Sequence, residues 1–152
     1  MADTGPVNQT MRSFGYPDSA VAGYRHWAVL LRPQQATLGA LILACREEAT
    51  AFSAISPPAA AELPAAIRDI ERALAAAFRY DKINYLMLMM VDPHVHFHVL
   101  PRYAAPREFA GIAFSDPGWP RLPDLAHAAS LSPECRAELI ATIRRHWESG
   151  RS

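Results

Sequence analysis

Cysteine, net charge and long apolar runs are scarce in this chain of 152 residues, and each shortage argues against a class of protein. Its two cysteines, Cys45 and Cys135, lie far apart, which fits neither a disulfide framework nor a cysteine zinc site. The formal net charge is zero, so no broad electrostatic field attracts nucleic acid or a membrane. No apolar run reaches the roughly 18 residues that span a membrane. Residues 1–15 are polar, so we expect no signal peptide and a cytoplasmic location.

Lysine is almost absent, since Lys82 is the only one and arginine carries the remaining positive charge. An arginine side chain offers a planar fork that suits phosphate or carboxylate. A GC-rich genome produces the same preference, and we favour that interpretation of the composition.

What the chain does contain is a run of three histidines at every second position, His94-Val95-His96-Phe97-His98-Val99, which holds half of its six histidines. In an extended strand, successive side chains point to opposite faces. The three imidazoles would then share one face, and the apolar residues between them would enter a core. These intervening residues are β-branched or aromatic, which favours a strand over a helix. The pattern predicts a strand that carries the chemistry of the protein.

Further strands are predicted on both sides of a central helical region. Residues 1–20 show no clear pattern and are expected to form a loose arm. Residues 24–32 and 37–45 are apolar runs joined by a short polar link, which predicts two antiparallel strands. Residues 83–90 form another apolar run, and only three residues separate it from the histidine run. A link this short predicts a hairpin.

Two helices are predicted to begin at the same local signal, a serine cap followed by proline. Ser56-Pro57 opens a run expected to end near Arg79, and Pro64 inside it should kink the helix or delay its regular part. Ser132-Pro133 opens a second helix over residues 132–148, and the proline-rich residues 104–131 before it are expected to be irregular. Apolar residues recur at spacings of three and four in both helices. They are Leu63, Ile67, Ile70, Leu74 and Phe78 in the first, and Leu139, Ile140, Ile143 and Trp147 in the second.

The run from His94 to Leu100 matches the motif His-φ-His-φ-His-φ-φ, where φ is a hydrophobic residue. On this motif the chain resembles the histidine triad (HIT) family, and the order of the expected elements over residues 24–103 is similar as well. The resemblance and the local patterns together predict one α+β domain over residues 1–152, with its core at residues 24–103. Its antiparallel sheet would have about five strands, with one long helix packed on it and a C-terminal helix.

The resemblance implies a nucleotide hydrolase or nucleotidyl transferase that acts at an α-phosphate. His96 would attack phosphorus and form a covalent nucleotidyl-histidine, His98 would contact the phosphate, and His94 would orient the nucleophile. Candidate substrates are dinucleoside polyphosphates, such as diadenosine polyphosphates, and nucleoside phosphoramidates. A homodimer with no bound metal or other cofactor is also implied. On physical grounds, His96 can attack through one ring nitrogen if a nearby backbone carbonyl holds the other as an N–H donor.

Two positions depart from the pattern that many family members share. The histidine that follows a glycine on the second strand is absent here, where Gly39 precedes Ala40. The Gly-Gln-Ser/Thr segment before the triad is replaced by Met89-Met90-Val91-Asp92-Pro93. Arg102 and Asn84 are the candidate substrate-binding residues. An exposed arginine at a strand end, and a polar strand residue with a satisfied side chain, remain the alternatives for these two.

Other interpretations of the triad stay open. A non-catalytic nucleotide-binding module could keep the three histidines and lose the supporting groups. Alternating histidines on a strand could also ligate zinc in a metal-dependent hydrolase. Only Asp92 lies close by in sequence as a carboxylate ligand, so we expect no metal. Finally, the histidines could fill a polar face of the sheet without any chemistry.

Overall fold

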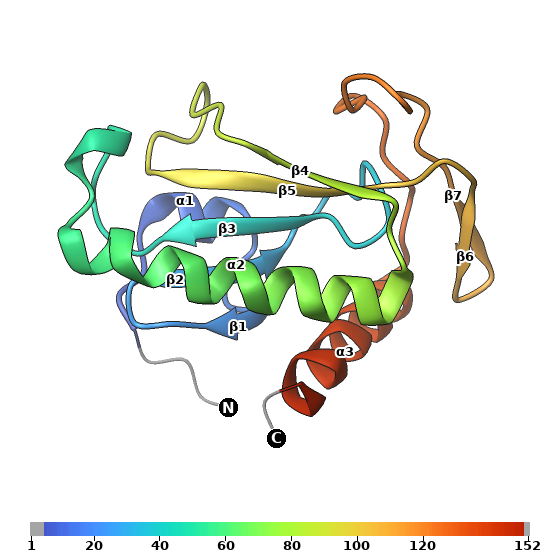
Figure 1. The fold of residues 1–152 in the computed structure, drawn as a ribbon, viewed down its shortest axis with the longest axis horizontal. Helices are drawn as coiled ribbons and strands as arrows, with labels where there is room; N and C mark the ends of the chain where they lie inside the picture. Colours follow the sequence, from blue (N-terminus) through green and yellow to red (C-terminus); the bar gives the residue numbers. More distant parts are fainter. Residues whose placement is uncertain (1–4, 151–152) are drawn as a thin grey trace.

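The computed structural model describes residues 5–150, which contain a five-stranded antiparallel sheet between helices (Figure 1). The predicted α+β class is confirmed, as are the antiparallel pairs formed by the first two predicted strands and by the last two. One further strand, β1, begins at the last residue of the segment that we expected to be a loose arm. In sheet order the strands are β1 (Ala20–Gly23), β2 (Trp27–Leu31), β3 (Leu41–Cys45), β5 (His96–Arg102) and β4 (Lys82–Leu86).

Helices α2 (Pro57–Phe78) and α3 (Pro133–Ser149) pack on one face of the sheet, with α2 running along it in Figure 1. Both begin at the predicted serines, Ser56 and Ser132, whose side chains accept a backbone N–H three residues later. Pro64 lies within α2 and neither delays nor ends it. The main core lies between these helices and the sheet, and includes Trp27, Val29, Leu43, Ile70, Leu74, Val99, Leu139 and Trp147.

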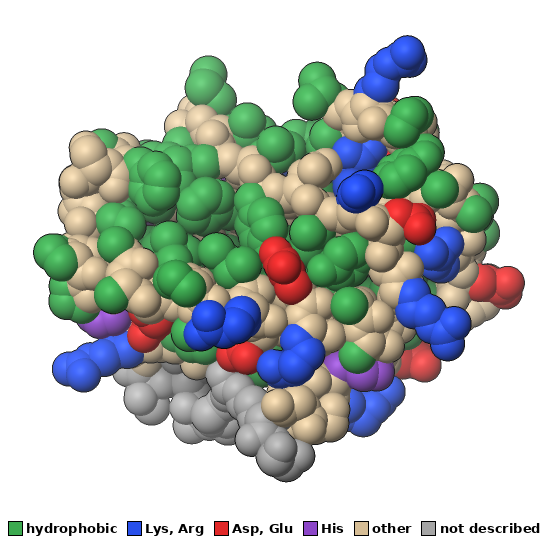
Figure 2. Space-filling model, viewed as in Figure 1, with side chains coloured by type: hydrophobic (Ala, Val, Ile, Leu, Met, Phe, Trp, Pro, Cys, Tyr) green, Lys and Arg blue, Asp and Glu red, His purple; other side chains and the backbone are tan. Residues whose placement is uncertain are grey.

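The outer surface on this side is divided by polarity. Figure 2 shows hydrophobic side chains gathered over the left part of this face, and charged side chains over its lower part and along its right side. None of the helices within residues 5–150 has the length and apolarity needed to cross a membrane.

The opposite face of the sheet is covered by the N-terminal segment, which corrects the prediction of a loose arm. Helix α1 (Gln9–Ser13) buries Met11 completely, against Leu30 and Ile42 of the sheet. The side chain of Asn8 caps α1 and also donates to two backbone carbonyls, at 2.9 Å each. Without this cover the apolar face of β2 and β3 would meet water, so burial explains why the segment is ordered. The first four residues of the predicted arm, 1–4, lie outside the described residues.

The link between β4 and β5 is longer than we predicted. Strand β4 ends at Leu86, the last residue paired with β5, and residues 87–95 form a loop. Met89 has a positive φ of 51°, a conformation outside the extended region that a continuing strand requires. After this loop β5 begins at His96, so His94 lies before the strand.

Short elements occupy the remaining connections. A 3-10 helix, η1 (Phe52–Ala54), precedes α2. The predicted irregular segment contains one hairpin, formed by β6 (Arg107–Phe109) and β7 (Ile112–Phe114). The rest of that segment up to α3 has no further strand or helix.

Candidate active site

The register of the sheet decides which side chains accompany the histidines. His98 pairs with Ile42 and His96 pairs with Ala44 on the neighbouring strand β3. Directly opposed residues of an antiparallel pair share a face, and Ile42 and Ala44 belong to the cluster around Met11. The two histidines therefore lie on the face that α1 covers. The residues that alternate with them point to the main core as predicted: Val95, Phe97 and Val99.

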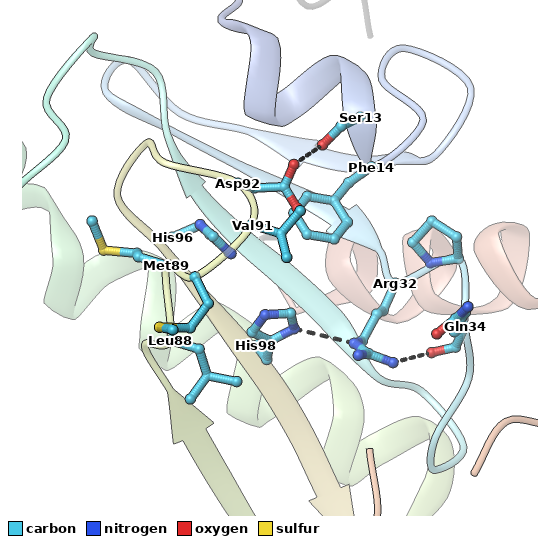
Figure 3. Close-up of a pocket in the computed structure, with 12 residues that line it drawn as sticks. Ser13, Phe14, Arg32, Gln34, Leu88, Met89, Val91, Asp92, His96 and His98 are labelled. Atoms are coloured by element: carbon cyan, nitrogen blue, oxygen red, sulfur yellow. Dashed lines mark hydrogen bonds between the residues drawn. The ribbon is translucent and has the colours of Figure 1, made fainter. Parts of the chain in front are cut away.

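A pocket of about 570 Å³ opens beside the rings of His96 and His98 (Figure 3). Three segments that are distant in sequence form its walls. They are the end of α1 with Ser13 and Phe14, the end of β2 with Arg32, Pro33 and Gln34, and the loop residues 88–92. The phenyl ring of Phe14 contacts both imidazoles, with centroid separations of 5.3 Å to His96 and 5.9 Å to His98.

The imidazole of His96 is oriented by the backbone. Its Nδ1 lies 2.7 Å from the carbonyl oxygen of His94, which can only accept a hydrogen bond. Nδ1 therefore carries the proton, and the lone pair of the neutral ring is on Nε2. This is the arrangement that nucleophilic attack by His96 requires.

The imidazole of His98 is held in the opposite tautomer. Its Nδ1 accepts a hydrogen bond from Nε of Arg32 at 3.1 Å, so Nε2 of the neutral ring carries the proton. Burial, with a further effect of the positive charge of Arg32, lowers the pKa of His98 to about 4. At neutral pH His98 is thus an uncharged N–H donor. Its ring lies 5.2 Å from that of His96, centroid to centroid.

His94 does not share the pocket with the other two histidines. Its Nε2 donates to a carboxylate oxygen of Glu48 at 2.8 Å, and its Nδ1 accepts from the hydroxyl of Thr10 at 2.9 Å. The backbone N–H of His94 also donates to the Thr10 oxygen. The ring of His94 thus connects α1 with the segment before β5. Only two of the three predicted rings line the pocket.

Arg102 and Asn84 lie outside the pocket as well. The guanidinium of Arg102 is buried and forms two hydrogen bonds with the carboxylate of Asp116, at 2.7 and 3.1 Å. It also donates to the side-chain oxygen of Asn84 at 2.7 Å. The structure therefore does not bring these two residues to the histidines. It gives them contacts that connect β4, β5 and the segment after β7.

Metal ligands are not clustered in the part of the chain that the structure describes. Within residues 5–150, no three side chains of the histidine, cysteine, aspartate or glutamate type are grouped so that they could hold a metal ion.

The comparison with known families decides the identity of the domain. A sequence model of the HIT domain matches residues 19–105, more than half of the chain. This chain belongs to the HIT family. Its fold is similar to that of a histidine triad protein from Bradyrhizobium japonicum, with 19% identity and a TM-score of 0.70 over 92% of this chain and 96% of that chain. A second, from Sinorhizobium meliloti, has 18% identity and a TM-score of 0.71 over 92% and 95%.

A third similar structure carries a metal. It is a zinc-bound histidine triad family protein from Mycobacterium smegmatis, with 18% identity and a TM-score of 0.59 over 87% of this chain and 85% of that one. At such identities the likeness shows the fold alone. No curated protein sequence matches the chain.

Compared with the family pattern, this HIT protein has mostly apolar side chains at the two altered positions, with Asp92 as the polar exception. Ala40 is fully buried beside Leu100, so no polar group replaces the missing histidine there. The segment that replaces Gly-Gln-Ser/Thr forms the outer rim of the pocket, where Met90 and Val91 are 87% and 90% exposed. Asp92, at its end, accepts a hydrogen bond from the hydroxyl of Ser13 at 2.6 Å across the pocket.

Arg32 and Phe14, which contact the histidine rings, are among the pocket residues of this HIT protein that the sequence analysis missed. A signal for Arg32 was present, because it stands two residues after Leu30 and so continues one face of β2. To use that signal, one must know which side chains of β2 lie on the same face of the sheet as the histidines of β5. The pairing of both strands with β3 provides this information. Phe14 has no comparable signal, because it comes from a short helix that no periodicity marks.

Proposed function

We propose that this HIT protein is a nucleotide hydrolase or nucleotidyl transferase that cleaves its substrate at an α-phosphate through a covalent adduct on His96. The hydrogen bond between Nδ1 of His96 and the carbonyl oxygen of His94 carries the proposal. It leaves a lone pair on Nε2 of a ring that lines a pocket of about 570 Å³, large enough for a small ligand.

In the first step Nε2 of His96 attacks the α-phosphorus. A nitrogen–phosphorus bond forms, and the bond from phosphorus to the leaving group breaks with its electron pair going to the leaving group. In the second step the oxygen of water, or of another acceptor, attacks the same phosphorus and loses its proton to solvent. The nitrogen–phosphorus bond breaks with its electron pair returning to Nε2 of His96, which releases the nucleotidyl group. Two displacements of this kind replace one difficult step by two easier ones.

His98 supports this sequence as a fixed donor. Because its Nδ1 accepts from Arg32, its Nε2–H is free to donate to a non-bridging oxygen of the phosphate. A preorganised donor of this kind stabilises the negative charge that develops during transfer. Its place on a rigid strand, one position beyond Phe97, keeps its spacing from His96 fixed.

The family resemblance and the pocket rim support the proposed substrate class. Dinucleoside polyphosphates and nucleoside phosphoramidates both offer an α-phosphate with a leaving group. Leu88, Met89 and Val91 line the same pocket as the histidines and offer apolar contacts to a nucleobase. A homodimer remains our expectation from the family resemblance, and a cytoplasmic location remains our expectation from the sequence.

Mass spectrometry tests the proposal directly. The protein is incubated briefly with diadenosine tetraphosphate or adenosine 5′-phosphoramidate, quenched and digested, and the peptide containing His96 is examined for added adenylate. We expect the adduct in the parent protein and none in His96→Ala. A parent that turns over a substrate at the same rate as His96→Ala would contradict the proposal.

A second candidate is a nucleotide-binding module without catalysis. The buried Ala40 and the apolar rim at Met90 and Val91 favour it, because both lack the polar groups that many family members place near phosphate. Calorimetry that detects AMP binding, together with no turnover and no adduct across a nucleotide panel, would identify this case.

Activity that disappears on chelation and returns with zinc would instead indicate a metal-dependent hydrolase.

A further inference from the structure

Arg32 occupies an unusual place for a charged side chain. It follows β2 directly and is only 8% exposed, yet its guanidinium lines the same pocket as His96 and His98 (Figure 3). The backbone around it is fixed. Its N–H donates to the carbonyl of Ala40 at 3.0 Å, and its own carbonyl accepts from the side chain of Gln35 at 2.8 Å. These backbone hydrogen bonds therefore fix Arg32 in place where the chain leaves β2.

The guanidinium of Arg32 has no carboxylate partner among the described residues. Its contacts are Nε to Nδ1 of His98 at 3.1 Å and one terminal nitrogen to the carbonyl of Gln34 at 2.6 Å. An arginine has five N–H donors, so these two bonds leave donors on both terminal nitrogens. Burial lowers the pKa of Arg32, and no acidic group within residues 5–150 offsets that cost. A buried guanidinium without a counter-ion is a site prepared for an anion.

Arg32 also supplies the positive charge of the pocket. His98 is neutral at physiological pH, because burial and the neighbouring arginine lower its pKa to about 4. Of the residues that line the pocket, Asp92 is the acid, and its carboxylate is already bonded to Ser13. A phosphate beside the two imidazoles would therefore find its fixed cation in Arg32.

We propose that Arg32 binds a non-bridging oxygen of the substrate's phosphate through its terminal nitrogens, while its Nε–H holds His98 in the tautomer that donates to the same phosphate. This assignment rests on the proposed function, because it takes the ligand to be a nucleotide. It gives the site an anion ligand directly after β2, whereas the missing histidine would stand at Ala40, directly before β3. Arg32 is thus a binding residue for substrate and a positioning residue for His98.

Calorimetry with AMP and with adenosine separates these roles from a structural one. We expect Arg32→Gln to weaken AMP binding by at least about tenfold, the loss of a charge-assisted hydrogen bond. Adenosine has no phosphate, so its affinity should change by less than about twofold. Arg32→Lys should recover part of the AMP affinity, because it restores the charge without the fork. Arg121→Gln, which removes an exposed arginine outside the pocket, is the control for charge and should bind AMP as the parent does.

NMR of the imidazole nitrogens tests the second role. In the parent, His98 should carry its proton on Nε2 and stay neutral down to about the pKa of 4. In Arg32→Gln the pKa of His98 should rise, and the single tautomer should give way to a mixture. Thermal unfolding of each variant shows whether the fold is kept, and the ratio of AMP to adenosine affinity remains informative even for a less stable variant.

The outcomes distinguish this inference from the proposed function. Equal losses for AMP and adenosine, or no loss for either, would overturn the assignment of Arg32, even if the adduct on His96 is found. Selective loss of AMP binding in Arg32→Gln supports the assignment even where the parent shows no turnover, in which case only the catalytic proposal fails. A parent that binds no AMP at all would overturn the assignment.

Discussion

Nδ1 of His96 lies 2.7 Å from the backbone carbonyl oxygen of His94, while the ring of His94 is bonded elsewhere, to Thr10 and Glu48. The first and second histidines of the triad are therefore connected through the main chain and not through their rings. A carbonyl oxygen is present whatever side chain residue 94 carries. The two histidines should accordingly respond very differently to substitution.

The first prediction compares His96→Ala with His94→Ala. His96→Ala removes the proposed nucleophile and should reduce turnover by at least about a thousandfold, as expected for a residue that forms the covalent intermediate. His94→Ala keeps the carbonyl and should reduce turnover by less than about tenfold. Steady-state kinetics with adenosine 5′-phosphoramidate measures both, and circular dichroism verifies the fold. Equal losses in the two variants would show that the ring of His94 takes part directly.

The parts of the fold that depend on local pattern were predictable from the sequence. Alternation of histidine with apolar residues placed Val95 and Val99 in the core, and a serine cap with proline gave the start of α2 at Pro57. These features need only the period of a strand and the chemistry of a helix end. Each is determined within a few neighbouring residues, so one sequence contains the whole signal.

The features that sequence reasoning missed depend on contacts between distant segments. Helix α1 is too short to show a period, and it is ordered because Met11 covers an apolar face that other strands create. Arg32 reaches His98 across β3, so its role follows from the register of three strands. The two predicted substrate ligands, Arg102 and Asn84, bond to each other, a contact that spacing along the chain does not show.

A second prediction concerns the buried pair of Arg102 and Asp116. The side chain of Asp116 is fully buried, and its carboxylate also accepts the backbone N–H of Tyr103 at 3.1 Å. Asp116→Ala leaves the guanidinium of Arg102 without its partner and should lower the free energy of unfolding by about 3–5 kcal/mol. Chemical denaturation measures this loss. AMP affinity of the folded variant should equal that of the parent, and a selective loss of AMP affinity would instead place Arg102 at the substrate.

A third prediction uses two glycines with positive φ. Gly39 has a φ of +84°, and an added Cβ would lie 2.8 Å from a ring carbon of Phe78, the buried last residue of α2. Gly111 has a φ of +77°, and an added Cβ would meet nothing within 4 Å. Gly111→Ala should therefore cost only the backbone strain, about 1 kcal/mol. Gly39→Ala should cost about 1–3 kcal/mol more, because the core must move. Similar unfolding midpoints for the two variants would contradict the steric argument.

The last prediction follows from the low pKa of His98. Burial first, and then the charge of Arg32, lower the pKa from 6.5 to about 4 in the folded protein. Between these values the unfolded chain binds a proton on residue 98 that the folded protein does not. The contribution of His98 to the free energy of unfolding is therefore complete above pH 6.5, falls as the pH falls toward 4, and is lost below that. The size of the loss is on the order of 3 kcal/mol.

His98→Asn isolates this effect, because an asparagine oxygen can replace Nδ1 as the acceptor of the Arg32 N–H but does not titrate. The charged and titratable groups that act on His98 in the parent are Arg32, His96 and Asp92, and all three stay in the variant. When both proteins are unfolded in urea between about pH 7 and pH 4, the free energy of unfolding of the parent should therefore fall relative to that of the variant as the pH falls, since only the parent loses the stability linked to residue 98. Curves that stay parallel over this range would mean that His98 titrates alike in the folded and unfolded states, which the burial of its ring beside Arg32 does not allow.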